Sequence, residues 1–457
     1  MGLETICQPC FGYTMNSDIH HKQHWAVGTY IDLMLAAIIM QIIFFFTSVW
    51  VGTYGSDFFD KNLEEIQYVL RMQIGLGWMM CIIAGLGFSI LPLIYDVPGF
   101  EKTVMRIYVT MNMSGQFAIM FGIVSRDIAV FHTLSTIGLT LLCGSLICLI
   151  SPAMTIFKSK KIESDTMGAF SYSIGAIMPI LGIVTIICWI ARDYFNGVLK
   201  ISEALVFDFF IPLAIIATII SHINRRLDWE IIKPSNTGKS YGIFTILLLL
   251  AVISEPLSNS GDISMRINAT LSSLPYFFIF IMLNPKQIIT KIKQGNPYSK
   301  MVITAIFWLP FIGIASYMEI MQYVETTKAM MSYYRWILIF GFSFQALWGF
   351  AAFLHDDHKR VSIHRRKSQW LILVTINLGT LVTIYSMFSS WYSGEILIQY
   401  PRYGIALYAL SYILILIYWL KDIFFSIDDW HKIPLYYDQY LAHPEQGPGF
   451  DLELSND

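Results

Sequence analysis

The chain has 457 residues, of which 55% are hydrophobic and only 14% are charged, and its formal net charge at pH 7 is -2. This composition leaves too little polar surface for a large soluble globule, and the near-neutral charge gives no sign of a nucleic-acid partner. We therefore predict an integral membrane protein whose main contact is the lipid bilayer.

Twelve apolar stretches follow one another along the chain with short polar connections. A helix needs about 20 apolar residues to span the hydrocarbon of a bilayer. Runs such as Phe244–Ile253 lack the alternation of apolar and polar residues that marks a membrane barrel, so we predict that the spans are helices. The predicted spans are 26–51, 72–95, 103–124, 128–153, 169–191, 203–222, 240–258, 264–284, 301–320, 330–354, 369–388 and 404–425.

The connections are too short to hold a soluble domain, so the sequence predicts one membrane domain over 26–425. It is flanked by polar tails over 1–25 and 426–457. No cleavable signal is expected, because the first apolar run begins after a mixed segment and is longer than a signal core. Insertion is therefore expected to follow the first helix.

Lysine and arginine residues crowd alternate loops, after the fourth, sixth, eighth and tenth spans. Cytoplasmic loops are the ones that carry an excess of such residues. The pattern predicts a multi-pass protein of the plasma (inner) membrane with both termini in the cytoplasm. The basic residues are Lys158, Lys160 and Lys161, then Arg225, Arg226, Lys233 and Lys239, then Lys286, Lys291, Lys293 and Lys300, and finally Lys359, Arg360, Arg365, Arg366 and Lys367.

The N-terminal tail contains a Cys-x-x-Cys pair, Cys7 and Cys10, followed by His20. Thiolate and imidazole groups are the usual ligands of zinc, so a cytoplasmic metal site is one interpretation. The alternative is a reduced tail without a metal, since the chain has a single pair of this kind and irregular histidine spacing.

Charged side chains inside membrane spans need a partner or a path to water, because each costs about 2.5 to 3.5 kcal/mol on insertion scales. In the predicted topology, five of them lie toward the outer half of the membrane. We predict that they form a buried ion-pair cluster with Arg335 as its hub, because a guanidinium fork can bind two carboxylates. The alternative is that they lie near helix ends and extend to the interface. The five residues are Asp208, Glu255, Arg266, Glu319 and Arg335.

Several segments between about residues 70 and 355 contain glycine, proline and aromatic residues at characteristic spacings. The segments are Gly75–Trp78 with Gly85 and Ile90–Pro92, Met105–Gly115, Ser254–Pro256 with Ser272–Pro275, and Gly313–Tyr317 with Tyr333–Phe342. Read in order, they resemble the catalytic subunit of haem-copper oxidases. The resemblance implies an all-α membrane protein with a twelve-helix bundle like that of cytochrome c oxidase subunit I.

The chain departs from this family at the metal ligands, where the family has histidines. By the inferred alignment, Tyr333 and Arg335 replace a His-x-His pair, Ser254 and Glu255 replace a His-His pair, and Leu70–Met72 stand where the second helix has its histidine. A protonated guanidinium cannot ligate iron or copper as a neutral imidazole does. We therefore predict that haem is not bound and that the oxygen-reducing centre is lost.

The sequence favours a non-catalytic or repurposed membrane component that resembles subunit I, for which the family implies other membrane subunits as partners. A secondary transporter or channel for a small solute or ion is the alternative, because Pro212, Pro256 and Pro310 could break helices at a binding site. A third hypothesis is an active oxidase or nitric-oxide-type reductase with unconventional ligands.

Overall fold

The computed structural model describes the chain between residues 33 and 425 with gaps, and every element within the described residues is a helix. The predicted tails, 1–25 and 426–457, lie outside the described residues. The described residues are 33, 35–44, 46–47, 61–94, 102–157, 173–195, 197–226, 234–255, 261–286, 297–324, 332–358, 367–393 and 399–425.

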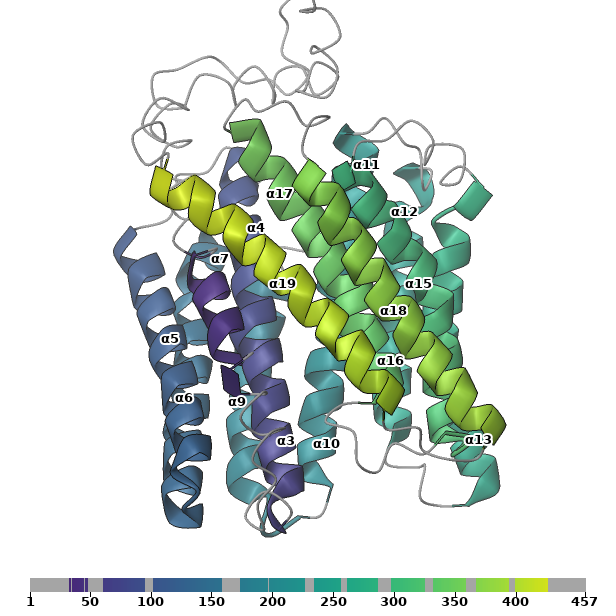
Figure 1. Ribbon diagram of the computed structural model, residues 1–457, viewed down its shortest axis with the longest axis horizontal. Coiled ribbons are helices and arrows are strands. Elements are labelled where there is room, and N and C mark those ends of the chain that lie inside the picture. Colours follow the sequence, from purple (N-terminus) through teal and green to yellow (C-terminus); the bar gives the residue numbers. More distant parts are fainter. Residues whose placement is uncertain are drawn as a thin grey trace, which may run out of the picture.

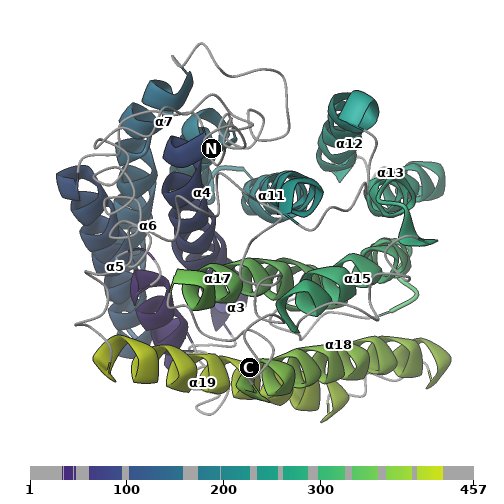
Figure 2. The same ribbon diagram turned by 90° about the horizontal axis from the view of Figure 1, so that it is seen from above.

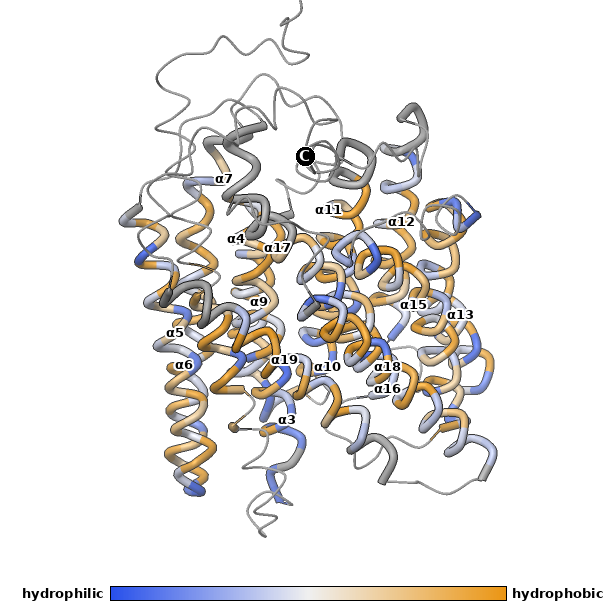
Figure 3. The backbone as a smooth tube through the Cα atoms, turned by 45° about the horizontal axis from the view of Figure 1, so that its top comes forward, coloured by the Kyte–Doolittle hydropathy of each residue, from blue (hydrophilic) through white to orange (hydrophobic). Residues whose placement is uncertain are grey.

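The described part of the chain forms twelve helices, and eight of these are long and apolar enough to cross a membrane. Shorter apolar helices occupy the remaining four predicted spans, at Leu35–Phe44, Gly175–Ala191, Gly238–Ser254 and Tyr403–Tyr418. Figure 3 shows hydrophobic residues along most of the helix length and hydrophilic residues at several helix ends. These findings confirm a multi-pass, all-helical membrane protein.

The helices lie side by side in one bundle, and several of them are interrupted by π-helical segments (Figure 1). In chain order after Leu35–Phe44, the elements are α3 (Leu63–Met72), η1 (Gln73–Met79) and α4 (Met80–Ile94); α5 (Lys102–Ser125); α6 (Ile128–Cys148) and α7 (Ile150–Phe157); η2 (Ser173–Ile177) and α9 (Met178–Ala191); α10 (Val198–Glu203), η3 (Ala204–Phe210) and α11 (Ile211–Arg226); α12 (Pro234–Ser254); α13 (Asp262–Met282); α15 (Pro297–Ile320); α16 (Tyr333–Trp336), η5 (Ile337–Phe344) and α17 (Gln345–His358); α18 (Lys367–Ser393); and α19 (Gln399–Phe425).

Three helices form the core of the bundle, and we call them the core helices: α3–η1–α4, α10–η3–α11 and α16–η5–α17. Their apolar windows are 94%, 89% and 100% buried, whereas those of the other five long spans are 33% to 61% buried. Figure 2 shows α4, α11 and α17 near the middle, with α5 and α6 on one side, α12 and α13 on another, and α18 and α19 along a third. The surrounding helices therefore separate the core helices from lipid.

The first core helix begins earlier than the hydropathy pattern predicts. The apolar stretch starts at residue 72, but the helix starts at Leu63 and includes Arg71. The hydropathy pattern leaves Arg71 outside the span, because a charge lowers the local hydropathy. The helix includes it because Glu203 on a neighbouring helix pairs with its side chain.

Helices α5 and α6 pack so closely that their backbones meet at two glycines. A Cβ atom added at Gly115 would lie 2.7 Å from the carbonyl oxygen of Gly138, and one added at Gly138 would lie 2.6 Å from that of Gly115. Small residues allow such close approach between membrane helices. The pair therefore depends on the absence of a side chain at both positions.

Gly138→Ala is expected to destabilise the protein by about 1 to 3 kcal/mol, because a backbone oxygen cannot move aside as a flexible side chain can. Gly242→Ala on α12 is the matched control, since a Cβ there would meet nothing within 4 Å. Thermal unfolding of the purified variants in detergent measures the difference. Equal melting temperatures for the two variants would contradict the close packing of α5 on α6.

Candidate functional site

Each core helix carries a charged residue directly before its π-helical segment. Arg71 lies two residues before η1, Glu203 is the last residue of α10 before η3, and Arg335 lies two residues before η5. π-helical turns inside α-helices are rare and are frequently found at functional sites. The shared position of these charges marks this end of the bundle as the candidate site.

These three charges and Asp208 form a network that we call the ion-pair cluster: Arg71, Glu203, Asp208 and Arg335. Arg71 places Nε and Nη2 each 2.7 Å from Glu203 Oε1. Arg335 donates from Nη1 to Glu203 Oε2 at 2.5 Å and from Nη2 to Asp208 Oδ2 at 3.1 Å. The Glu203 side chain is only 4% exposed. A carboxylate this deeply buried needs such paired donors, because they offset the loss of its hydration.

The π-helical segment η3 explains how one arginine reaches two acids of the same helix. Glu203 and Asp208 are five residues apart, and in a regular α-helix residues at this spacing point to different sides. In a π-helix the backbone hydrogen bonds join residues five apart, so such residues lie nearly one above the other. The extra residue in η3 therefore turns both carboxylates toward Arg335.

Tyr334 connects the cluster to a third acid. Its hydroxyl donates to Asp208 Oδ2 at 3.2 Å, and its backbone N–H donates to Glu319 Oε1 at 3.1 Å. Arg335 occupies the next position on α16 and lies over the Tyr334 ring, with Cζ 5.5 Å from the ring centroid. Tyr334 therefore holds acids of η3 and α15 on two sides of α16.

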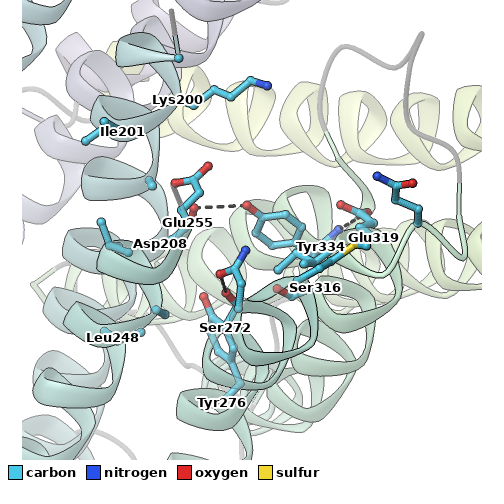
Figure 4. A pocket seen from close by; sticks show the side chains of 18 residues that line it. Lys200, Ile201, Asp208, Leu248, Glu255, Ser272, Tyr276, Ser316, Glu319 and Tyr334 are labelled. Atoms are coloured by element: carbon cyan, nitrogen blue, oxygen red, sulfur yellow. Dashed lines mark hydrogen bonds between the residues drawn. The ribbon is translucent and has the colours of Figure 1, made fainter. Parts of the chain in front are cut away.

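A cavity of about 420 Å³ lies beside the cluster, between α10–η3, the end of α12, α13, α15 and α16 (Figure 4). Its lining includes Asp208, Glu255 and Glu319. The lining residues that are exposed to solvent are Gly197, Lys200, Ile201 and Gln322, so the cavity opens toward the beginning of α10 and the end of α15. The other lining residues are Ala204, Leu248, Ala251, Val252, Met265, Asn268, Ser272, Tyr276, Ser316, Ile320 and Tyr334.

Several polar groups of the lining have no hydrogen-bond partner among the described residues. Asp208 Oδ1 and Glu255 Oε2 are buried oxygens of this kind. The Tyr276 side chain also lines the cavity and is only 3% exposed. Buried polar groups are nearly always paired in proteins, with the protein itself, with water or with a ligand. These atoms are therefore candidates for contact with water or a bound molecule.

A second polar group lies at the same end of the bundle. Glu65 accepts from His132 Nε2 at 2.6 Å and from Arg192 Nε at 3.4 Å, and Arg192 lies over the Trp189 ring. The Tyr68 ring stacks on Trp189. The side chains of Glu65 and His132 are 25% and 33% exposed, so this group is more solvated than the ion-pair cluster.

The structure places four of the five predicted cluster residues together. Asp208 and Arg335 form an ion pair, and Glu255 and Glu319 line the same cavity as Asp208. Arg335 is 9% exposed, so it does not extend to the interface. Arg266 is exposed on α13 and does not line the cavity. It shares an exposed stripe with Thr270 and Leu274, one and two turns further along α13, which faces away from the cluster.

Sequence reasoning missed Glu203, Arg71 and Tyr334. Glu203 is the first residue of the predicted sixth span, 203–222, where a charge needs no partner inside the membrane. The signal that could have found it is its spacing of five residues from Asp208, which matches a π-helical repeat. The predicted metal site at Cys7, Cys10 and His20 lies outside the described residues.

The residues present do not fit the haem and copper that the family resemblance implies. At the inferred ligand positions, Arg335 is ion-paired, and Ser254 donates to Asn268 Oδ1 at 2.8 Å. An arginine side chain has no free lone pair to bind a metal. Within the described ranges, no group of three or more His, Cys, Asp and Glu side chains could hold a metal ion.

Comparison with protein-family models found no model that matches the chain, and comparison with curated proteins found no match. The twelve described helices, eight of them long and apolar enough to cross a membrane, show a multi-pass helical protein in contact with the lipid bilayer.

Proposed function

We propose that this chain is a repurposed membrane component with a fold like that of haem-copper oxidase subunit I, in which an ion-pair cluster replaces the metal centre. The observation that carries the proposal is the position of the cluster. Arg335 and Arg71 fall at or beside the inferred ligand positions of the tenth and second helices, and both pair with Glu203 of the sixth. A guanidinium group cannot ligate haem iron or copper, so the proposed component, non-catalytic or repurposed, does not reduce oxygen at this place.

The same proposal includes a location and an orientation. The alternating basic loops support the plasma (inner) membrane, with both termini in the cytoplasm. In this orientation the cluster and the cavity lie toward the outer face. Other membrane subunits are the partners that the resemblance implies.

An absorbance spectrum of the purified protein tests the loss of the metal centre. We expect no Soret band, and less than one haem iron or copper per chain, from a host that is supplied with haem precursor and copper. A membrane cytochrome from the same host is the control for haem supply. A Soret band in proportion to protein would contradict the proposal and favour an active oxidase or nitric-oxide-type reductase with unconventional ligands.

A second function, transport or conduction of a small cationic solute, is favoured by the cavity. Its lining contains three carboxylates, and two buried oxygens of Asp208 and Glu255 have no partner among the described residues. It opens to solvent at one end of the bundle. Intramembrane acids of this kind mark ion and substrate pathways in membrane proteins.

Glu255→Gln is expected to lower the cation-driven current of proteoliposomes by about tenfold, because a charged hydrogen bond contributes about 1.5 to 3 kcal/mol. Asp262→Asn is the matched control, since Asp262 is exposed in the first turn of α13 and does not line the cavity. Currents recorded on a supported membrane after a jump in cation concentration measure the effect. A variant current equal to that of the wild type would count against a path through the cavity.

A further inference from the structure

The cavity is too large for a bare metal ion and suits a small organic molecule. Its volume is about 420 Å³, whereas a water molecule takes up about 30 Å³ of liquid. Pockets that bind small molecules have volumes of about 300 to 1,000 Å³. The expected occupant therefore has several non-hydrogen atoms.

The acids of the cavity form two separate poles. Figure 4 shows Asp208 and Glu255 together on one side and Glu319 on the other, with Tyr334 between them. They come from different parts of the chain: Asp208 lies in η3, Glu255 directly follows α12 and Glu319 lies in α15. Carboxylates that coordinate a single cation converge on one point within about 2.6 Å of it. Two separated poles instead match a molecule that carries a positive charge at each end.

Uncharged groups form most of the rest of the cavity lining. The Tyr276 side chain is one of them, and the residue is only 3% exposed. Asn268 accepts from the Ser254 and Ser272 hydroxyls through Oδ1, which leaves its amide N–H groups available. The apolar lining comes from Ala204, Leu248, Ala251, Val252, Met265 and Ile320. A chain of methylene groups fits such walls.

The charges around the cavity are unbalanced. Among the described residues, two guanidinium groups, Arg71 and Arg335, pair with Glu203 and Asp208, and no ion pair joins an arginine to Glu255 or Glu319. Both oxygens of Glu203 are occupied by arginine. The oxygens of these four acids that have no arginine partner among the described residues therefore belong to acids that line the cavity. Lys200 also lines it, but on the exposed side where the cavity opens.

We propose that the cavity binds a small aliphatic diamine, with one ammonium group between Asp208 Oδ1 and Glu255 Oε2 and the other at Glu319. This inference rests on the second proposed function, because it names the solute of the same cavity. Each ammonium has three N–H donors, which suits the Asp208 and Glu255 oxygens that lack donors. Glu319 Oε1 already accepts from the Tyr334 backbone N–H, and a carboxylate oxygen can accept more than one hydrogen bond. The Tyr334 ring, between the poles, lies beside the methylene chain.

Titration calorimetry on the full-length protein in lipid nanodiscs tests the proposal with five probes: putrescine, butylamine, γ-aminobutyrate, sodium and calcium. Putrescine is expected to bind at least about tenfold more tightly than butylamine, because only the diamine reaches both poles. Glu255→Gln and Glu319→Gln should each lower putrescine affinity to the level of butylamine. Asp262→Asn, which removes an exposed acid of α13, should leave it unchanged.

A series of diamines with two to six carbons, measured on the wild-type protein, needs no variant and is expected to show a length optimum. Equal affinity along the series would overturn the two-pole arrangement. If γ-aminobutyrate, sodium or calcium bound in a way that depends on Glu255 and putrescine did not bind, the diamine proposal would be overturned. The proposal that the cavity binds a solute would stand. Absence of binding for all five probes would overturn both proposals.

Discussion

Replacing Arg335 with leucine is expected to destabilise the protein by about 3 to 5 kcal/mol, the usual cost of removing one partner of a buried ion pair. Arg335 is the one guanidinium that contacts Asp208 among the described residues, and it also contacts Glu203. The variant keeps the Arg71 contact with Glu203 but leaves the Asp208 carboxylate buried beside an apolar side chain. Unfolding of the purified variant in detergent, followed by SDS titration, measures the loss.

Arg266→Leu is the matched control for this experiment, because Arg266 is exposed on α13. Its expected effect lies within about 0.5 kcal/mol of zero. The stability of Arg335→Lys should lie between those of the two leucine variants. An ammonium group keeps the positive charge but lacks the forked guanidinium that binds two carboxylates. If Arg335→Leu were as stable as Arg266→Leu, the cluster would have no structural role.

Glu203→Gln is expected to lower the stability of the protein by a similar amount, about 3 to 5 kcal/mol. The substitution changes only one oxygen into an amide nitrogen. Both oxygens of Glu203 accept from arginine, at 2.7 Å from Arg71 and 2.5 Å from Arg335. In the variant, the amide N–H₂ group would face one of these guanidinium donors. The two buried guanidinium groups would then lose the carboxylate that they share, and only Arg335 would keep an acid, Asp208. The same SDS titration measures the loss.

Two further variants separate charge from local packing at this site. Glu65→Gln removes an acid that pairs with His132 and Arg192 in a more solvated place, so a smaller loss of about 1 kcal/mol is expected. Adding Arg71→Gln to Glu203→Gln restores the charge balance and should recover part of the stability. If the stability loss of the double variant equalled the sum of the losses of the two single variants, charge balance would not explain the effect.

The membrane character of the chain and the placement of its helices could be predicted from hydropathy. A run of about 20 apolar residues is typical of a helix that spans a membrane. Which helices form the core could not be predicted. The windows of α5 and α10–η3–α11 are both apolar, yet they are 39% and 89% buried. Apolar side chains suit lipid and protein equally well, so hydropathy does not distinguish the two environments.

The charged site could be predicted only in part. Asp208 and Arg335 stood out because charges inside apolar spans need partners. Glu203 and Arg71 lie at span ends, where a charge needs no explanation, and their pairing depends on the contact of separate helices. The sequence analysis includes Arg266 because it lies inside a predicted span. In the structure, Arg266 lies on the exposed side of α13 and does not line the cavity.

The π-helical segments also could not be predicted from hydropathy. Their extra residue shifts every later side chain around the helix axis, and no residue type marks them in Ala204–Phe210 or Ile337–Phe344. Residue spacing in a regular helix would have placed Asp208 on a different face from Glu203.

The account depends on a direct interaction between Arg335 and Glu203 inside the membrane domain. A double-mutant cycle with Arg335→Leu, Glu203→Gln and their combination, measured by SDS unfolding, tests this interaction most directly. We expect a coupling energy of about 1 to 3 kcal/mol, so that the double variant is clearly more stable than additivity allows. Additive losses would contradict the ion-pair cluster and, with it, the proposal that this cluster replaces a metal centre.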